Sequence, residues 1–291
     1  LEFRRVLFRS PLLRVADSAM IAKNSKDAKQ ALQKALSLDP GNAEALRRMV
    51  GLHISEGRYD EALGVARAAQ KQAAKSPIGL MLEGDVLVAQ QKWDEAASAY
   101  RAGQKKHNSA DFVVRQYEAL SQEGKKTEAE RDAADWIKSN PKDVVVRVFL
   151  AERAIRSKHY EIAAQQYKAI LQQQPENAAI LNNLAWVSGQ LKDAKAIEYA
   201  EKALALQPNS PAVMDTLGML LVERGNLARG LKLLQKAVAA APEAYAIRLN
   251  LAKALAGAGR KDEARRELEP LVKLGDKFQG KEEVAALMKT L

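Results

Sequence analysis

A small residue recurs along this chain at a nearly constant spacing of thirty-three or thirty-four residues. In most periods an acidic residue stands just before it. The small column consists of Ala28, Ala62, Ala96, Ala129, Ala163, Ala196, Gly230 and Ala264. A period of this length indicates a repeat protein, in which each repeat buries its apolar face only by stacking on its neighbours.

Two further columns keep the same register. Glycine stands five residues before the small residue at Gly57, Gly124, Gly225 and Gly259, and proline twelve residues after it at Pro40, Pro141, Pro175, Pro208 and Pro242. Glycine ends a helix, an acidic residue suits the start of the next one, and proline stops it. A small side chain between them lets two antiparallel helices approach closely. The sequence therefore predicts an all-α chain of eight helix-turn-helix repeats.

This pattern resembles the tetratricopeptide repeat family over residues 11–276. The match is best at residues 182–186 with 199–208, and at residues 216–218 with 235–242. The resemblance implies a right-handed superhelical solenoid whose first helices line a concave groove. We expect the repeats to end near residues 40, 74, 108, 141, 175, 208, 242 and 276, and residues 277–291 to form a capping helix. The sixth repeat is one residue short around Gly189–Asp193, so its turn should be irregular.

Composition restricts the function without naming it. The chain has 291 residues, no Cys, 46 Lys and Arg against 36 Asp and Glu, and a net charge of +10. Cations and anions alternate closely, which favours a solvated surface of mixed charge over a nucleic-acid interface. No stretch approaches the roughly 18 apolar residues that a membrane helix needs. Residues 1–10 resemble translated sequencing-adapter sequence, so we exclude them from the fold and expect the natural start, with any secretion signal, upstream of Pro11.

Three segments carry a narrower resemblance. Residues 182–193, 208–218 and 283–291 resemble the C-terminal region of the TPR-repeat lipoprotein of the bacterial PEP-CTERM/exosortase system. That resemblance implies a periplasmic or outer-membrane-attached protein of exopolysaccharide production or protein sorting. It also implies further repeats upstream and a membrane attachment only through an N-terminal lipid anchor. Without a signal peptide in the full gene, the protein would be cytoplasmic.

Residues for chemistry are few. His53, His107 and His159 stand in different repeats, which does not match the paired spacing of metal ligands. Acidic pairs such as Asp60/Glu61 and Asp94/Glu95 recur at one place in the repeat, where they favour helix starts rather than general acid–base catalysis. We therefore expect no catalytic residues, no metal and no cofactor, and hence no enzyme.

The family's register instead predicts a groove that binds a protein or peptide partner, with exopolysaccharide-machinery components as candidates. Most aromatic residues recur in columns and are interpreted as packing residues, whereas Trp186 stands alone on a first helix and is the best single anchor candidate. The predicted groove residues are Arg47, Asp85, Arg115, Glu118, Glu152, Asn182, Trp186, Asp215, Met219, Asn250 and Lys253.

Two other function classes stay open on the sequence alone. One is a regulatory or substrate-presenting tail of an enzyme whose catalytic domain lies upstream. The other is a nucleic-acid-associated helical repeat, motivated by the positive net charge. We expect the non-enzymatic binding scaffold.

Overall fold

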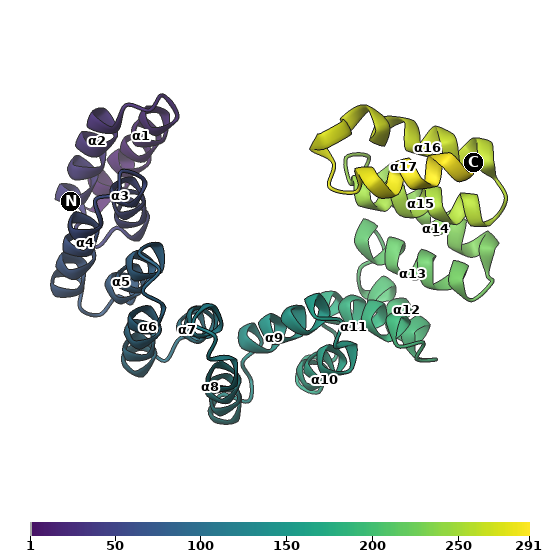
Figure 1. Cartoon of the computed structure of the whole chain (residues 1–291), viewed down its shortest axis with the longest axis horizontal. Coiled ribbons are helices and arrows are strands. Elements are labelled where there is room, and N and C mark those ends of the chain that lie inside the picture. The colour runs from purple at the N-terminus through teal and green to yellow at the C-terminus, as the bar shows by residue number, and fades with distance from the viewer. Residues whose placement is uncertain (1) are drawn as a thin grey trace. The chain divides into compact units, whose positions relative to one another are not determined.

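The computed structural model describes the backbone of residues 2–291 and the side chains of residues 11–291. Over this range the chain forms seventeen α-helices and one short 3-10 helix, which confirms the all-α prediction (Figure 1). The helices fall into two compact units, one up to residue 146 and one from residue 147 onward, called unit 1 and unit 2 below. The expectation that residues 1–10 do not belong to the fold falls on residues whose side chains the structure does not describe.

In unit 1 each helix packs against the next along the chain. The odd-numbered helices are the first helices of the repeats and the even-numbered ones the second helices. The unit contains α1 (Glu2–Ile21), α2 (Ser25–Leu38), α3 (Ala43–Ser55), α4 (Tyr59–Gln72), α5 (Ile78–Ala89), α6 (Trp93–His107), α7 (Ala110–Gln122) and α8 (Lys126–Ser139). First helices also contact one another directly, as α3 and α5 do.

Unit 2 repeats this arrangement. Helix α9 (Val145–Arg156) begins at the end of unit 1, and its Arg147 donates to Gln166 of α10 at 3.2 Å. The first helices α11, α13 and α15 pack in succession. The remaining elements are α10 (Tyr160–Leu171), α11 (Ala178–Gln190), α12 (Ala196–Leu206), α13 (Pro211–Glu223), α14 (Leu227–Ala240), α15 (Tyr245–Gly257), α16 (Lys261–Leu274), the 3-10 helix η1 (Gly275–Lys277) and α17 (Lys281–Thr290).

The small column is where the two helices of a repeat approach each other. Its seven alanines are at most 1% exposed, and Gly230 is buried. At Gly230 a Cβ atom would lie 2.7 Å from the carbonyl oxygen of Gly218, on the facing helix α13. The requirement for a small side chain is therefore a direct consequence of backbone-to-backbone approach, as the sequence predicted.

The turns between the two helices share one backbone conformation. Gly57, Gly124, Gly225 and Gly259 have φ between +71° and +84°, the left-handed region expected of a helix-ending glycine. Where no glycine stands in this column, other residues adopt the same region: Lys23, Gln91 and Lys158 have φ between +57° and +59°. The sixth repeat differs as expected, because its left-handed residue is Lys192 and α12 begins only at Ala196 itself.

The C-terminal helix covers the last repeat. Val284 is the one fully buried residue of α17, while Leu287, Met288 and, just after the helix, Leu291 pack partly against the same cluster of α15 and α16 residues. Before it, Phe278 meets Tyr245 edge to face with ring centroids 6.3 Å apart. Most other residues of α17 are exposed.

Two glycine substitutions test the close-approach column. Gly230→Ala should lower the stability of unit 2 by about 1–3 kcal/mol, because the added methyl group meets the Gly218 backbone. Gly64→Ala, in the middle of α4 with nothing within 4 Å of its Cβ position, should instead raise stability by about 0.5–1 kcal/mol. Hydrogen exchange in α13–α14 and in α4 measures each effect locally. Equal changes in protection for the two variants would contradict this explanation.

Candidate partner-binding groove

All eleven predicted groove residues lie on first helices, in two separate sets. Unit 1 carries Arg47 on α3, Asp85 on α5, and Arg115 and Glu118 on α7. Unit 2 carries Glu152 on α9, Asn182 and Trp186 on α11, Asp215 and Met219 on α13, and Asn250 and Lys253 on α15. Each unit therefore presents its own candidate surface.

In unit 1 two of these residues bind each other. The Nη1 atom of Arg115 donates to Oδ1 of Asp85 at 2.6 Å, which links α7 to α5. The hydroxyl of Tyr100, a residue only 1% exposed on α6, donates to the same oxygen at 2.7 Å. Burial, reinforced by the negative charge of Asp85, raises the pKa of the Tyr100 hydroxyl well above its usual value. Asp85 is thus a structural acceptor at the junction of three helices.

A second pair of the same kind was missed by the sequence reasoning. Arg48 on α3 binds Asp17 on α1 through Nε and Nη2, at 2.6 and 3.0 Å. The hydrogen bond from Arg48 lowers the pKa of the Asp17 carboxyl. Asp17 and Asp85 both stand eleven residues before the small column, and Arg48 and Arg115 both fourteen before it. A comparison of these two positions in adjacent repeats would have found the pairing.

The other two predicted residues of unit 1 face solvent. The Arg47 side chain is 55% exposed and comes no closer than 3.9 Å to Glu44 of its own helix. Glu118 is exposed on α7. These two charges are available to a partner, whereas Asp85 and Arg115 first have to give up contacts within the protein.

In unit 2 a half-buried carboxylate joins two first helices. Nδ2 of Asn250 on α15 donates to both carboxylate oxygens of Asp215 on α13, at 3.1 and 2.9 Å. Burial raises the pKa of Asp215 to about 6, although the hydrogen bond from Asn250 and the charge of Lys253 act in the opposite direction. Lys253 itself forms an ion pair with Glu283 of α17 at 2.5 Å. Polar contacts therefore link α13 to α15, and α15 to the C-terminal helix α17.

The residues on α11 are less fully partnered. Trp186 is 40% exposed and meets Tyr160 edge to face with ring centroids 5.9 Å apart. One turn earlier, Oδ1 of Asn182 is buried without a hydrogen-bond donor. Met219 on the next first helix packs partly against the cluster of α14 and α15 residues. Glu152 is exposed, and its charge adds to the burial that raises the pKa of the Tyr167 hydroxyl.

The three histidines occupy unrelated places. His53 is 3% exposed in α3, and burial lowers its pKa. His107 ends α6 and stacks on Phe112 at 6.3 Å between ring centroids, and His159 precedes α10 at the surface. Among the described residues no three His, Asp or Glu side chains gather in a group that could hold a metal ion. In the same part of the chain no helix has the length and apolar character to span a bilayer.

Comparison with known proteins decides the family. Two models of the tetratricopeptide repeat match, one over residues 19–86 and 221–291 and the other over residues 81–144 and 150–211. The chain belongs to the tetratricopeptide repeat family. Proteins of this family are typically non-catalytic and bind protein partners.

Curated relatives of this tetratricopeptide repeat chain are bacterial. TPR repeat-containing protein PA4667 of Pseudomonas aeruginosa is 26% identical over 205 residues, which cover 66% of this chain and 34% of that protein. TPR repeat-containing protein YpiA of Bacillus subtilis is 26% identical over 129 residues, covering 44% of this chain and 30% of that protein. The chain thus spans about a third of the length of the curated relatives it matches.

A solved structure supports the fold. The crystal structure of the APC/C hetero-tetramer Cut9–Hcn1 contains a chain that matches 96% of this one and is itself covered over 55% of its length, with 14% sequence identity and a TM-score of 0.55. At this identity the likeness concerns the fold alone.

Asp215 gives unit 2 a pH-dependent stability. The folded pKa of Asp215, about 6, exceeds the usual value of 3.8, so the native state binds the proton more tightly than the unfolded chain does. The stability that this proton binding contributes is fully present below pH 3.8 and is lost as the pH rises through about 6. At about pH 8 the free energy of unfolding of Asp215→Asn should therefore exceed that of the unsubstituted protein by roughly 1–2 kcal/mol, after allowance for solvent screening, and its melting temperature should be higher. The difference should shrink as the pH falls.

Asp262→Asn is the matched control for this experiment, because the Asp262 side chain in the same unit is 92% exposed. Thermal unfolding followed by circular dichroism between about pH 4 and 8 measures both variants. A stability difference for Asp215→Asn that stays constant with pH would contradict the assignment.

Proposed function

We propose that this protein is a non-enzymatic scaffold that binds an extended segment of a partner protein along its first helices. The observation that carries the proposal is Trp186, a large aromatic side chain that is 40% exposed on a first helix of unit 2. Exposed tryptophans of this kind often supply much of the binding energy of an interface. Asn182 lies on the same helix, and Met219 occupies the matching place on α13.

The distribution of charge supports a protein partner rather than a nucleic acid. Several arginines on the described surface are drawn into ion pairs: Arg48 with Asp17, Arg115 with Asp85, and Arg248 with Glu267 at 2.6 Å. Cations held by neighbouring carboxylates contribute little to binding phosphate groups, which depends on free positive charge. These three arginines therefore add no free positive charge for a phosphate backbone.

We further propose that the scaffold works in a bacterial envelope complex for exopolysaccharide secretion or protein sorting. The support is the resemblance of residues 182–193, 208–218 and 283–291 to the PEP-CTERM-system lipoprotein, together with the bacterial origin of both curated relatives.

The complete reading frame upstream of Pro11 tests the envelope location. Under this proposal it encodes a signal peptide that ends in a lipidated Cys, followed by more repeats. A start codon that leads straight into repeats would contradict the envelope location. The proposal of a binding scaffold would then stand without it.

The Trp186→Ala variant tests the groove. A peptide selected from a displayed random library on the purified protein should bind Trp186→Ala at least about tenfold more weakly, because the aromatic anchor is lost. Trp186→Phe should recover part of that loss. Fluorescence anisotropy with the labelled peptide measures the affinity, and circular dichroism confirms that helicity is unchanged.

Ile162→Ala serves as the matched control for the groove. Ile162 is 49% exposed on the second helix α10 of the same unit, so its truncation removes a comparable exposed apolar side chain from another face. Its affinity should remain that of the unsubstituted protein. Equal affinity for all three variants would remove Trp186 from the binding surface.

A further inference from the structure

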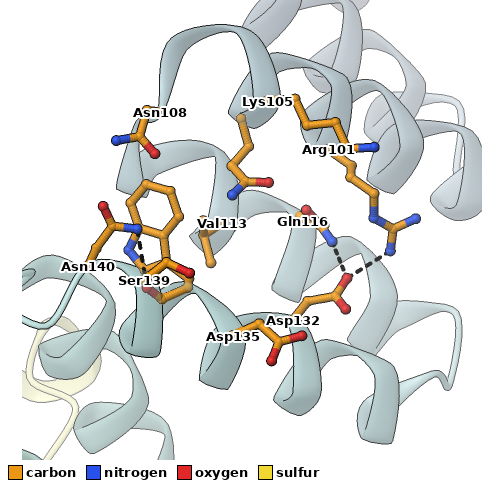
Figure 2. A pocket seen from close by; sticks show the side chains of 11 residues that line it. Arg101, Lys105, Asn108, Val113, Gln116, Asp132, Asp135, Ser139 and Asn140 are labelled. Atoms are coloured by element: carbon orange, nitrogen blue, oxygen red, sulfur yellow. Dashed lines mark hydrogen bonds and ion pairs between the residues drawn. The ribbon is translucent and has the colours of Figure 1, made fainter.

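Unit 1 contains a hollow that none of the predicted groove residues lines. It has a volume of about 410 Å³ and lies between the second helices α6 and α8, with α7 as its floor (Figure 2). Its volume falls in the range of small-molecule sites, about 300–1,000 Å³. It is therefore large enough for a ligand and separate from the first-helix surface.

The hollow stands beside an unusual residue of the repeat. Trp136 lies seven residues after the small column, where five other repeats have only a methyl group or a hydrogen atom: Ala35, Ala69, Gly103, Ala203 and Ala237. An indole is too large for the close helix approach that those residues permit. Trp136 lines the hollow, is 4% exposed, and its Nε1 has no hydrogen-bond acceptor. Because this nitrogen is itself closed off from solvent, the indole borders the hollow through its ring rather than through its N–H.

The charges around the hollow cancel. Nη2 of Arg101 donates to Glu128 at 2.7 Å and to Asp132 at 2.8 Å. Gln116 adds a hydrogen bond to the same oxygen of Asp132, at 2.5 Å, and Figure 2 shows both contacts converging there. The two remaining charged residues of the lining, Lys105 and Asp135, are opposite in sign. A charged ligand therefore gains no net attraction, and the site favours a neutral one.

The rest of the lining suits hydroxyl groups. Asn108 and Asn140 cap the C-terminal ends of α6 and α8, and Ser139 lies beside Asn140 (Figure 2). Nδ2 of Asn140 donates a hydrogen bond to the Trp136 carbonyl oxygen at 3.2 Å. Amide and hydroxyl side chains both donate and accept, as sugar hydroxyls do. Val113 supplies an apolar floor against which the C–H face of a ring can pack.

We propose that this hollow binds a neutral sugar ring, as a free hexose or as the end of a short neutral saccharide. Hydroxyl groups of the sugar exchange hydrogen bonds with Asn108, Ser139 and Asn140, and the sugar ring lies beside the Trp136 indole. A peptide backbone also donates and accepts, but it spaces these groups about 3.3 Å apart along an extended chain. Here the polar groups converge on one hollow instead.

The indole N–H signal of Trp136 in a ¹⁵N-correlated NMR spectrum reports binding directly. The chain has three Trp, so three indole signals are expected, and Trp136→Phe identifies the relevant one. Glucose, galactose, mannose and N-acetylglucosamine are titrated separately into the full chain. For at least one of them the Trp136 signal should shift and saturate, while the signals of Trp93 and Trp186 stay in place.

Variants separate the site from its surroundings. Asn108→Ala with Ser139→Ala should weaken sugar binding about five- to tenfold or more, the effect of losing one or two hydrogen bonds. Glu130→Gln should bind as the unsubstituted protein does, because Glu130 is exposed on α8 and does not line the hollow. Because Trp186 is unchanged throughout, the result is independent of the groove experiment.

Three results would overturn the proposal. One is the absence of a saturating Trp136 shift with every sugar in a folded protein. A second is an undiminished shift in the Asn108→Ala, Ser139→Ala variant. The third is a saturating shift with the neutral peptide acetyl-Gly-Gly-N-methylamide but not with a sugar, which would assign the hollow to a peptide segment.

Discussion

The close approach of two helices at one small residue per repeat is the contact on which the rest of this structure depends. Seven alanines and Gly230 bring the backbones together, and each repeat then presents an apolar face that only a neighbouring helix can cover. Within each unit, successive helices pack together because the next helix along the chain is the nearest one that can bury an apolar face. It also fixes the first helices on one side of their repeat, where their polar residues meet those of the next first helix.

The meeting of first helices explains why several predicted groove residues bind each other. Asp85 with Arg115, Asp17 with Arg48, and Asp215 with Asn250 each connect successive first helices. Half-buried polar groups are stable only with partners, and the adjacent first helix supplies them. A partner protein therefore meets two kinds of residue: those already engaged, which set the shape of the surface, and those such as Glu118 and Trp186 that remain open to contact.

Much of this architecture could be predicted from spacing alone, because the small, glycine and proline columns each mark a local backbone requirement. The irregular turn of the sixth repeat also followed from its missing residue. The pairing of Asp17 with Arg48 did not, since it depends on which positions of adjacent repeats face one another. The hollow beside Trp136 was not predicted for a related reason. It depends on a single large residue seven positions after the small column, a position that the sequence analysis did not compare between repeats, and its walls come from three helices.

Several turns between the two helices of a repeat place a non-glycine residue in an unfavourable backbone conformation. Lys23, Gln91, Lys158 and Lys192 adopt a left-handed backbone that costs a residue with a side chain about 1–2 kcal/mol, although glycine at the same place would avoid the cost. They hold this conformation because the two packed helices dictate where the turn must run. The helix contacts, rather than the turn residues, therefore determine the path of the connection, and the side chain at this place in the turn is not what holds the stacked helices together.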